Sequence, residues 1–196
     1  KNTGRRKHSL HYAFPFSDEW NAWMAASGKW MTQTDFAEFL EDHIVDVLPA
    51  PSSTDLEDDR FGNIAEFARL IGGKWAGPAE LMALSRGLRI NVEQKVVDQR
   101  VLNSGEARLT FESTHTNEQG EPLSVPNLFL LGIPVFEEGP VWRIPVRLRY
   151  RVAGGSVSWI MEPWNMQETF RQAARELAEL AAAETGLPLI YGAPTT

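Results

Sequence analysis

Apolar residues in the first half of the chain recur every three or four positions, which is the spacing of an amphipathic helix. The clearest stripe follows Thr32 and Asp35, a pair typical of a helix start because each side chain can bond the other's backbone N–H. Pro49 and Pro51 end this stripe, since proline removes a helical hydrogen bond. The sequence therefore predicts short N-terminal helices over residues 17–27, 33–48, 63–71 and 79–86.

The period of the apolar residues then changes to about 2, as in strands that bury one face. The most regular stretch is 141–152, in which the positions between the apolar residues carry four arginines and a proline. We predict an antiparallel β-meander that includes the alternating segments 88–93, 107–112, 141–152 and 156–161.

Two further segments refine this prediction. The apolar segment 125–136 contains Pro126 and Pro134, and proline cannot donate a hydrogen bond to a neighbouring strand. We therefore expect an edge strand or a broken strand there. The run Asn103-Ser104-Gly105 predicts a hairpin turn between two of the strands.

The last amphipathic segment covers residues 165–185, and Gly186 and Pro188 are expected to end it. With no repeat and no linker, the simplest fold class is α+β, with N-terminal short helices, an antiparallel β-meander and a long C-terminal helix packed on the sheet. We assign residues 1–16 to a basic N-terminal arm and residues 17–196 to a single domain.

Composition narrows the classes of protein. The chain has 196 residues, of which 43% are hydrophobic, enough to build a core. The absence of cysteine excludes disulfides, thiol catalysis and zinc–thiolate sites. No apolar run approaches the ~20 residues of a membrane span, so we expect no membrane partner and a cytoplasmic protein. The net charge of −7 argues against a globally basic nucleic-acid binder.

Charge is unevenly distributed, because nine acids and no lysine or arginine lie between residues 31 and 59. Three groups are candidate contact sites. They are a basic arm (Lys1, Arg5, Arg6 and Lys7), an acidic patch (Glu38, Glu41, Asp42 and Asp46) and an arginine stripe (Arg143, Arg147, Arg149 and Arg151).

The arginine stripe has three interpretations. On a strand, Arg147, Arg149 and Arg151 project from one face about 6.6 Å apart, a spacing compatible with phosphate contacts. Nucleic-acid readers place aromatic residues on the same face, however, and Trp142 and Tyr150 point the other way. The stripe can equally be a solvated face, or meet the acidic patch within a subunit or across an interface. We rank an acidic protein partner above nucleic acid because the rest of the chain is acidic.

No residue pattern is typical of a catalytic or metal site. His8 and His11 lie in a segment expected to be extended, where residues three apart face opposite ways. His43 falls on an apolar stripe, whereas Asp42 and Asp46 fall on the solvated side, which favours a core or half-buried histidine over an acid–base pair. We expect no enzymatic activity, no cofactor and no metal.

The composition favours a protein that contacts other subunits. Interfaces are enriched in arginine, aromatic residues and methionine and depleted in lysine. The chain has 14 arginines but 5 lysines, together with 7 tryptophans and 5 methionines. A GC-rich coding sequence is the competing explanation for the excess of arginine over lysine.

A family resemblance rests on residues 11–20 and 30–42, with Gln33–Asp42 the most specific part. The segments 145–150 and 186–192 are compatible with it. The chain resembles the YfdQ-like family of phage and prophage proteins of unknown function. The resemblance implies a phage or prophage origin and action in the bacterial cytoplasm, and it supplies no catalytic residues.

We therefore expect a phage or prophage-encoded, non-enzymatic, self-assembling protein, a ring, shell or cage subunit, in which the acidic patch meets the arginine stripe of a neighbouring copy. One alternative is a nucleic-acid-associated accessory factor of phage recombination or replication that uses the basic arm and the stripe. Another is an inhibitor of a host protein, with the acidic region 35–59 as a nucleic-acid mimic.

Overall fold

The structure is a computed structural model, and it describes residues 13–58, 61–87, 91–101, 107–116, 125–153 and 156–189. Within 91–101 and 107–116 only the backbone is described. The basic arm (Lys1, Arg5, Arg6 and Lys7) and the predicted turn at 103–105 lie outside the described residues.

The helices expected from the sequence are present. They are α1 (Asp18–Ala26), α2 (Gln33–His43), α4 (Gly62–Leu70), α5 (Pro78–Gly87) and α6 (Met166–Thr185), with a further short helix α3 (Ser53–Leu56). The Ser17 side chain caps α1 by accepting a hydrogen bond from the backbone of Trp20. Thr32 and Asp35 form the expected capping box of α2.

The second helix ends earlier than the sequence predicts. After His43 the chain forms a 3₁₀ turn (Ile44–Asp46) and then strand β2 (Val47–Leu48). β2 pairs antiparallel with a strand more than eighty residues later in the chain. This tertiary pairing overrides the helical pattern before the prolines are reached.

The sheet has six strands in the order β1-β8-β7-β6-β2, with β3 also paired to β6. The pairings are antiparallel except for the parallel contact of β3 with β6. The strands are β1 (Trp30–Thr32), β2 (Val47–Leu48), β3 (Trp75–Ala76), β6 (Leu128–Pro134), β7 (Val141–Ala153) and β8 (Ser156–Pro163). The expected α+β fold, with a meander β6-β7-β8, is confirmed.

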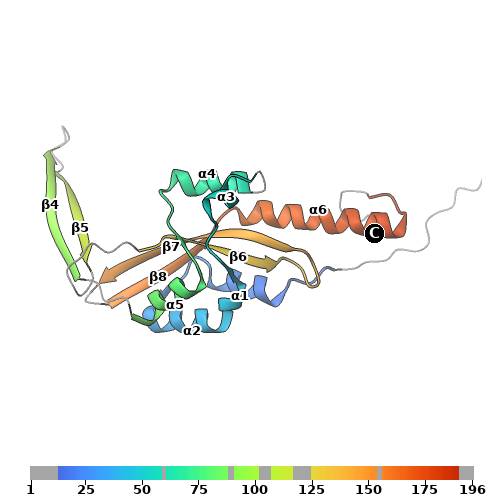
Figure 1. Cartoon of the computed structure of the whole chain (residues 1–196), viewed down its shortest axis with the longest axis horizontal. Helices are drawn as coiled ribbons and strands as arrows, with labels where there is room; N and C mark the ends of the chain where they lie inside the picture. Colours follow the sequence, from blue (N-terminus) through green and yellow to red (C-terminus); the bar gives the residue numbers. More distant parts are fainter. Residues whose placement is uncertain are drawn as a thin grey trace, which may run out of the picture.

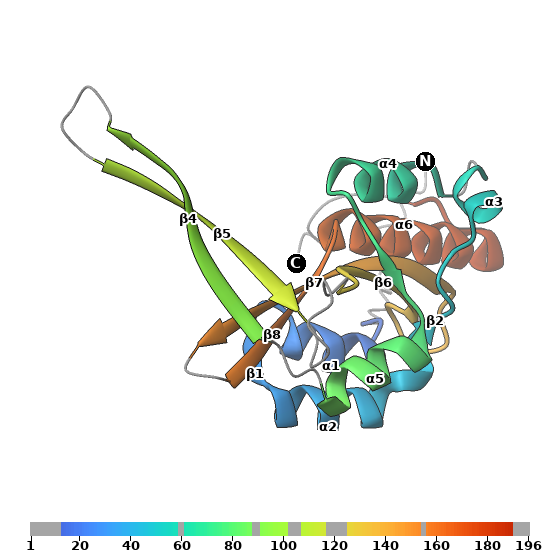
Figure 2. The same ribbon diagram turned by 60° about the vertical axis from the view of Figure 1, so that its left-hand side comes forward.

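Two expectations about the strands need correction. The segment around Pro126 and Pro134 is not an edge strand, because β6 pairs with β7 on one side and with β2 and β3 on the other. Pro126 precedes β6 and Pro134 is its last residue, so the ladder between them is intact. The segments 88–93 and 107–112 were expected in the same meander as 141–161, and this was wrong. The strands β4 (Asn91–Val101) and β5 (Ala107–Thr116) pair with each other in a separate hairpin, which stands away from the body (Figures 1 and 2).

The two faces of the sheet are covered differently. Helices α1, α2 and α5 lie on one face, and α4 and α6 lie on the other side (Figures 1 and 2). Most of the main core lies on the first face, where Trp23, Phe36, Leu40 and Trp159 are at most 1% exposed. On the other face a smaller cluster, Phe61, Ile64 and Leu130, joins α4 to β6.

The long helix α6 packs against the core only as far as Leu177. Ala173 is buried in the main core, and Met166, Ala174 and Leu177 pack against it. Beyond that point α6 extends past the end of the sheet (Figure 1), and Leu180 is 57% exposed.

Replacing Leu40, which is fully buried in α2, tests this core. Leu40→Ala is expected to lower the free energy of unfolding by about 2–5 kcal/mol, because it removes packing and leaves a cavity. Leu70→Ala, the same change at a leucine in α4 that is 69% exposed, should alter it by about 0.5 kcal/mol or less. Urea denaturation followed by circular dichroism measures both. Equal losses in the two variants would contradict the assignment of the core.

Candidate functional site

The arginine stripe lies on the face of β7 that is turned away from the main core. Ile144, Val146 and Leu148 are buried, whereas the arginines at the intervening positions are exposed. Arg149 binds Glu162 of β8, with Nη2 and Oε1 2.5 Å apart. The face therefore offers several guanidinium groups and has one acid, Glu162, in an ion pair with the stripe.

An aromatic residue lies on this same face, which the sequence reasoning missed. Trp30 of β1 pairs with Ile160 of β8, and Ile160 pairs with Arg149, so the three side chains share one face. The guanidinium of Arg151 stacks over the Trp30 ring, 4.2 Å from its centroid. Trp30 nevertheless remains 42% exposed. We call Trp30, Arg147, Arg149 and Arg151 the Arg–Trp surface.

Nothing local in the sequence places Trp30 next to the arginines. The strand β1 has three residues, and its partner β8 begins more than 120 residues later. The run Trp30-Met31-Thr32 is too short to show a strand period in the sequence, and its alternating exposure is seen only in the structure. Its position at the edge beside β8 is set by tertiary pairing.

The acidic patch is smaller than the sequence suggests. Asp46 was expected on a solvated face, but it is 8% exposed and accepts a 2.7 Å hydrogen bond from Nε1 of Trp23. Glu41 binds Arg86 of α5 at 3.1 Å. Glu38 and Asp42 remain as exposed acids of the patch. They belong to α2, which covers the face of the sheet opposite the arginine stripe (Figure 1).

His43 is half-buried, as the sequence predicts, and lies in an aromatic setting. The centroid of its ring is 4.6 Å from the ring centroid of Phe39 and 6.2 Å from that of Trp23. Nδ1 is 3.8 Å from Oδ2 of Asp46, which is already engaged by the Trp23 indole. The pair therefore anchors the end of α2 instead of presenting a carboxylate–imidazole couple to solvent.

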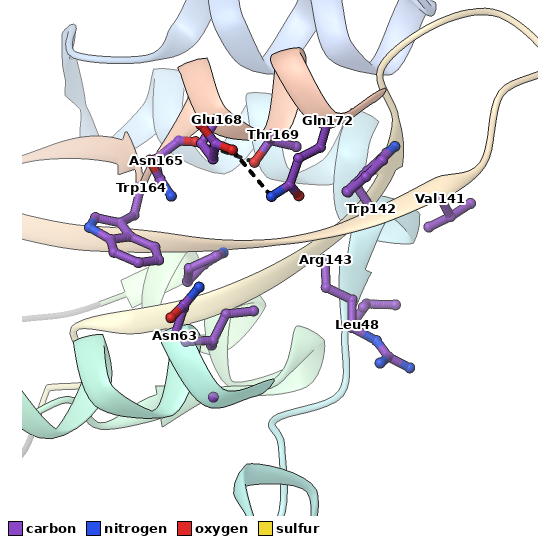
Figure 3. A pocket seen from close by; sticks show the side chains of 13 residues that line it. Leu48, Asn63, Val141, Trp142, Arg143, Trp164, Asn165, Glu168, Thr169 and Gln172 are labelled. Carbon is purple, nitrogen blue, oxygen red and sulfur yellow. Dashed lines mark hydrogen bonds between the residues drawn. The ribbon is translucent and has the colours of Figure 1, made fainter. Parts of the chain in front are cut away.

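The first residue of the stripe, Arg143, lines a cleft of about 630 Å³ between α4 and α6 (Figure 3). Its guanidinium stacks over the ring of Phe61, with 4.9 Å to the centroid. On the other side of the cleft, Trp164 stacks on Phe67 at 4.6 Å. Trp142 also lines it, and the indole N–H of this residue has no hydrogen-bond partner in the described part of the chain.

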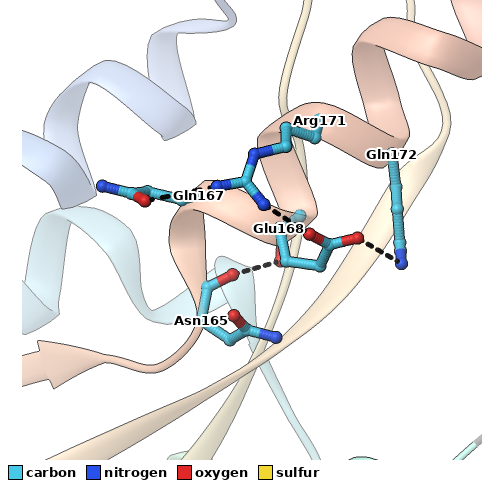
Figure 4. A network of polar contacts seen from close by, with 6 residues as sticks. Asn165, Gln167, Glu168, Arg171 and Gln172 are labelled. Carbon is cyan, nitrogen blue, oxygen red and sulfur yellow. Dashed lines mark hydrogen bonds and ion pairs between the residues drawn. The ribbon is translucent and has the colours of Figure 1, made fainter.

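The carboxylate that lines this cleft is already bound by neighbouring side chains. Glu168, in the first turn of α6, accepts hydrogen bonds from Arg171 at 2.8 Å and Gln172 at 3.3 Å (Figure 4). Thr169 donates to the backbone carbonyl of Asn165. Asn165 itself has a left-handed backbone, with φ 58°, and its side chain does not cap the helix. This network orders the start of α6 and leaves no unpaired carboxylate there to act as a base.

Another acid, Asp55, interacts electrostatically with Arg143. Hydrogen bonds from the side chain and backbone of Ser52 hold the pKa of Asp55 below its ordinary value, and Arg143 lowers it further. The ionised form of Asp55 is thus favoured in the folded chain and stabilises it. This contribution to folding stability is lost as the pH falls through the lowered pKa. Arg143 therefore has an acidic neighbour within its own chain.

Two absences concern the described residues. No group of three or more histidines and acids gathers there in a way that would hold a metal ion. In the same ranges, no helix is both long enough and apolar enough to cross a bilayer.

Comparison with known proteins gives one match. The model of a family described as an uncharacterized conserved protein (DUF2303) matches residues 1–194. A family of unknown function is what the resemblance in residues 11–42 led us to expect. No curated protein and no solved structure matches the chain.

Replacing Asp46 tests its reassignment from a surface acid to a buried anchor. Asp46→Ala is expected to lower the free energy of unfolding by about 1–3 kcal/mol, because it leaves the buried Trp23 indole N–H without an acceptor. Asp46→Asn keeps an acceptor oxygen and should recover much of this loss. Asp42→Ala removes an exposed acid and should change stability by about 0.5 kcal/mol or less. Urea denaturation distinguishes them, and a similar effect of the two alanine variants would refute the reassignment.

Proposed function

The chain belongs to the uncharacterized conserved family DUF2303, and for this member we propose a self-assembling, non-enzymatic structural protein, a subunit of a ring, shell or cage. Its origin in a phage or prophage and its action in the bacterial cytoplasm are part of the proposal. The observation that carries it is an apolar strip, a set of exposed apolar side chains on α6 and on the segments before α1 and after α6.

The apolar strip consists of Phe14, Phe16, Phe170, Leu180 and Leu187. Phe16 and Phe170 lie 6.0 Å apart, and both contact Phe136, which is buried at the end of the sheet. The five side chains of the strip are between 38% and 66% exposed. Phe170 and Leu180 belong to α6, Leu187 follows its end, and Phe14 and Phe16 precede α1. Exposed apolar groups that lie together are typical of a surface that another protein covers.

The charges of α6 favour a second copy of this chain as the partner. Arg171, Arg175 and Glu168, which binds Arg171, lie in the first half of the helix, so two arginines and one acid leave it basic by one charge. Glu176, Glu179 and Glu184 lie in the second half. Two α6 helices packed antiparallel would bring the basic half of each beside the acidic half of the other. Such a contact uses the same surface on both subunits and is therefore closed by two-fold symmetry.

The hairpin β4–β5 offers a second contact, which would extend pairs of subunits into a larger particle. Each of its strands is paired on one side only in the described part of the chain, so two outer edges are open. A two-stranded hairpin alone is marginally stable in water, and an open edge can pair with a strand of another chain. Because the two-fold contact of α6 closes at two subunits, a larger particle requires a second contact of this kind.

The native mass of the purified protein tests this function. We expect light scattering on a sizing column to give a discrete particle several times the 22.0 kDa of one chain. Leu180→Asp should reduce that mass, because it places a charge in the apolar contact. The matched control is Leu70→Asp, which changes a leucine in α4 that is somewhat more exposed than Leu180 and should leave the mass unchanged.

Circular dichroism of both variants shows that they remain folded. A wild-type mass of 22 kDa would overturn the proposed function. A particle that persists in Leu180→Asp would exclude the α6 strip as its contact.

A further inference from the structure

The Arg–Trp surface occupies the part of the sheet that helices leave uncovered. On the face turned away from the main core, α4 packs over Leu130 and Leu48, near the β2 edge. The opposite part of this face, formed by β1, β8 and the second half of β7, carries the exposed side chains of Trp30, Arg147 and Arg151. This surface is therefore accessible in a single copy of the chain.

Its cations form a regular row. Arg147, Arg149 and Arg151 occupy alternate positions of one strand, so their α-carbons repeat about every 6.6 Å. Arg147 has no hydrogen-bond or ion-pair partner among the described residues, although Glu162 lies opposite it in register. Glu162 instead pairs with Arg149, and this leaves the row with a net positive charge.

Trp30 adds an aromatic group to the row. Arg151 stacks over its ring at 4.2 Å and so fixes the orientation of both planar groups, while 42% of the residue stays exposed. Planar bases stack on such indole and guanidinium surfaces, and phosphates bind the guanidinium groups beside them. Rows of cations with an aromatic platform are typical of proteins that hold single strands without reading their sequence.

The acidic patch of a second copy fits this surface less well. Asp46 is buried and Glu41 already binds Arg86, so Glu38 and Asp42 are the exposed acids left in that patch. Carboxylates would also leave the exposed part of Trp30 without a partner, whereas a base would cover it.

We propose that the Arg–Trp surface binds single-stranded nucleic acid. Arg147, Arg149 and Arg151 contact phosphates of the strand, and one of its bases stacks on Trp30. This binding is independent of the apolar strip on α6 and gives the assembly a polyanionic cargo or template.

The test is fluorescence anisotropy of a labelled 20-nucleotide oligothymidine, titrated with the full-length protein at several salt concentrations. Three phosphate contacts predict that log affinity falls with log salt with a slope of about −2. Arg147→Gln should weaken binding at every salt concentration and make the slope shallower by about 0.7. The control, Arg69→Gln in α4, removes an exposed arginine that is not part of the surface and should leave the binding unchanged.

Replacement of Trp30 tests the stacking. Trp30→Ala is expected to weaken binding about tenfold with little change in the salt slope, because it removes a stacked base but no phosphate contact. Trp30→Phe keeps an aromatic ring and should recover part of the loss. Circular dichroism of the three Trp30 and Arg147 variants checks that they are folded.

Several results would overturn the proposal. They are no binding at low salt, a duplex of the same length bound as tightly as the single strand, or equal weakening by Arg147→Gln and Arg69→Gln. A fourth is a change in native mass in Arg147→Gln with oligonucleotide binding intact, which would assign the surface to a contact between copies. A loss of oligonucleotide binding that spares the native mass supports it.

Discussion

The buried indole of Trp159 is the group around which the helices and the sheet are organised. It is fully buried on β8, and its N–H donates to Oε1 of Gln33 at 2.7 Å. The Gln33 amide in turn donates to the carbonyls of Leu84 and Ser85 at the end of α5. A buried indole N–H is costly to leave unpaired, so the start of α2, the end of α5 and the centre of β8 are held in one arrangement.

This arrangement makes the sheet asymmetric. The ring of Phe36 stacks on Trp159 at 5.1 Å, and the Trp23–Asp46 bond ties α1 to the turn after α2 on the same face. Because α1, α2 and α5 all lie on one face, α4 and the N-terminal part of α6 remain to cover the other side, and they cover only part of it. The surfaces to which we assign contacts, the α6 strip and the Arg–Trp surface, are those that this unequal covering leaves exposed.

The unequal covering also relates the two proposals. The α6 strip is apolar and lies at the end of the sheet where β6 and β7 meet, whereas the Arg–Trp surface is cationic and lies toward the β1 edge. An apolar contact resists salt and a phosphate contact weakens with it, so the two surfaces respond to different conditions. The two proposed contacts therefore use different residues.

Most elements could be predicted from the sequence, because local hydrogen bonding and the period of apolar residues act over a few positions. The caps at Ser17 and Thr32, the helix 166–185 and the alternation along β7 are of this kind. Which strands became neighbours depended on tertiary packing. It placed β6 inside the sheet although prolines flank it, because both prolines fall at the ends of the ladder.

The same limit applies to the candidate site. Helical spacing put Asp46 on a solvated side, but the helix ends at His43, and the turn that follows buries Asp46 against Trp23. The alternation of β7 identified the row of arginines, while Trp30 reached that row through pairing with a strand more than 120 residues away. The period of apolar residues and helix capping are local properties that can be read from a sequence. Long-range strand pairing depends on how the whole core packs.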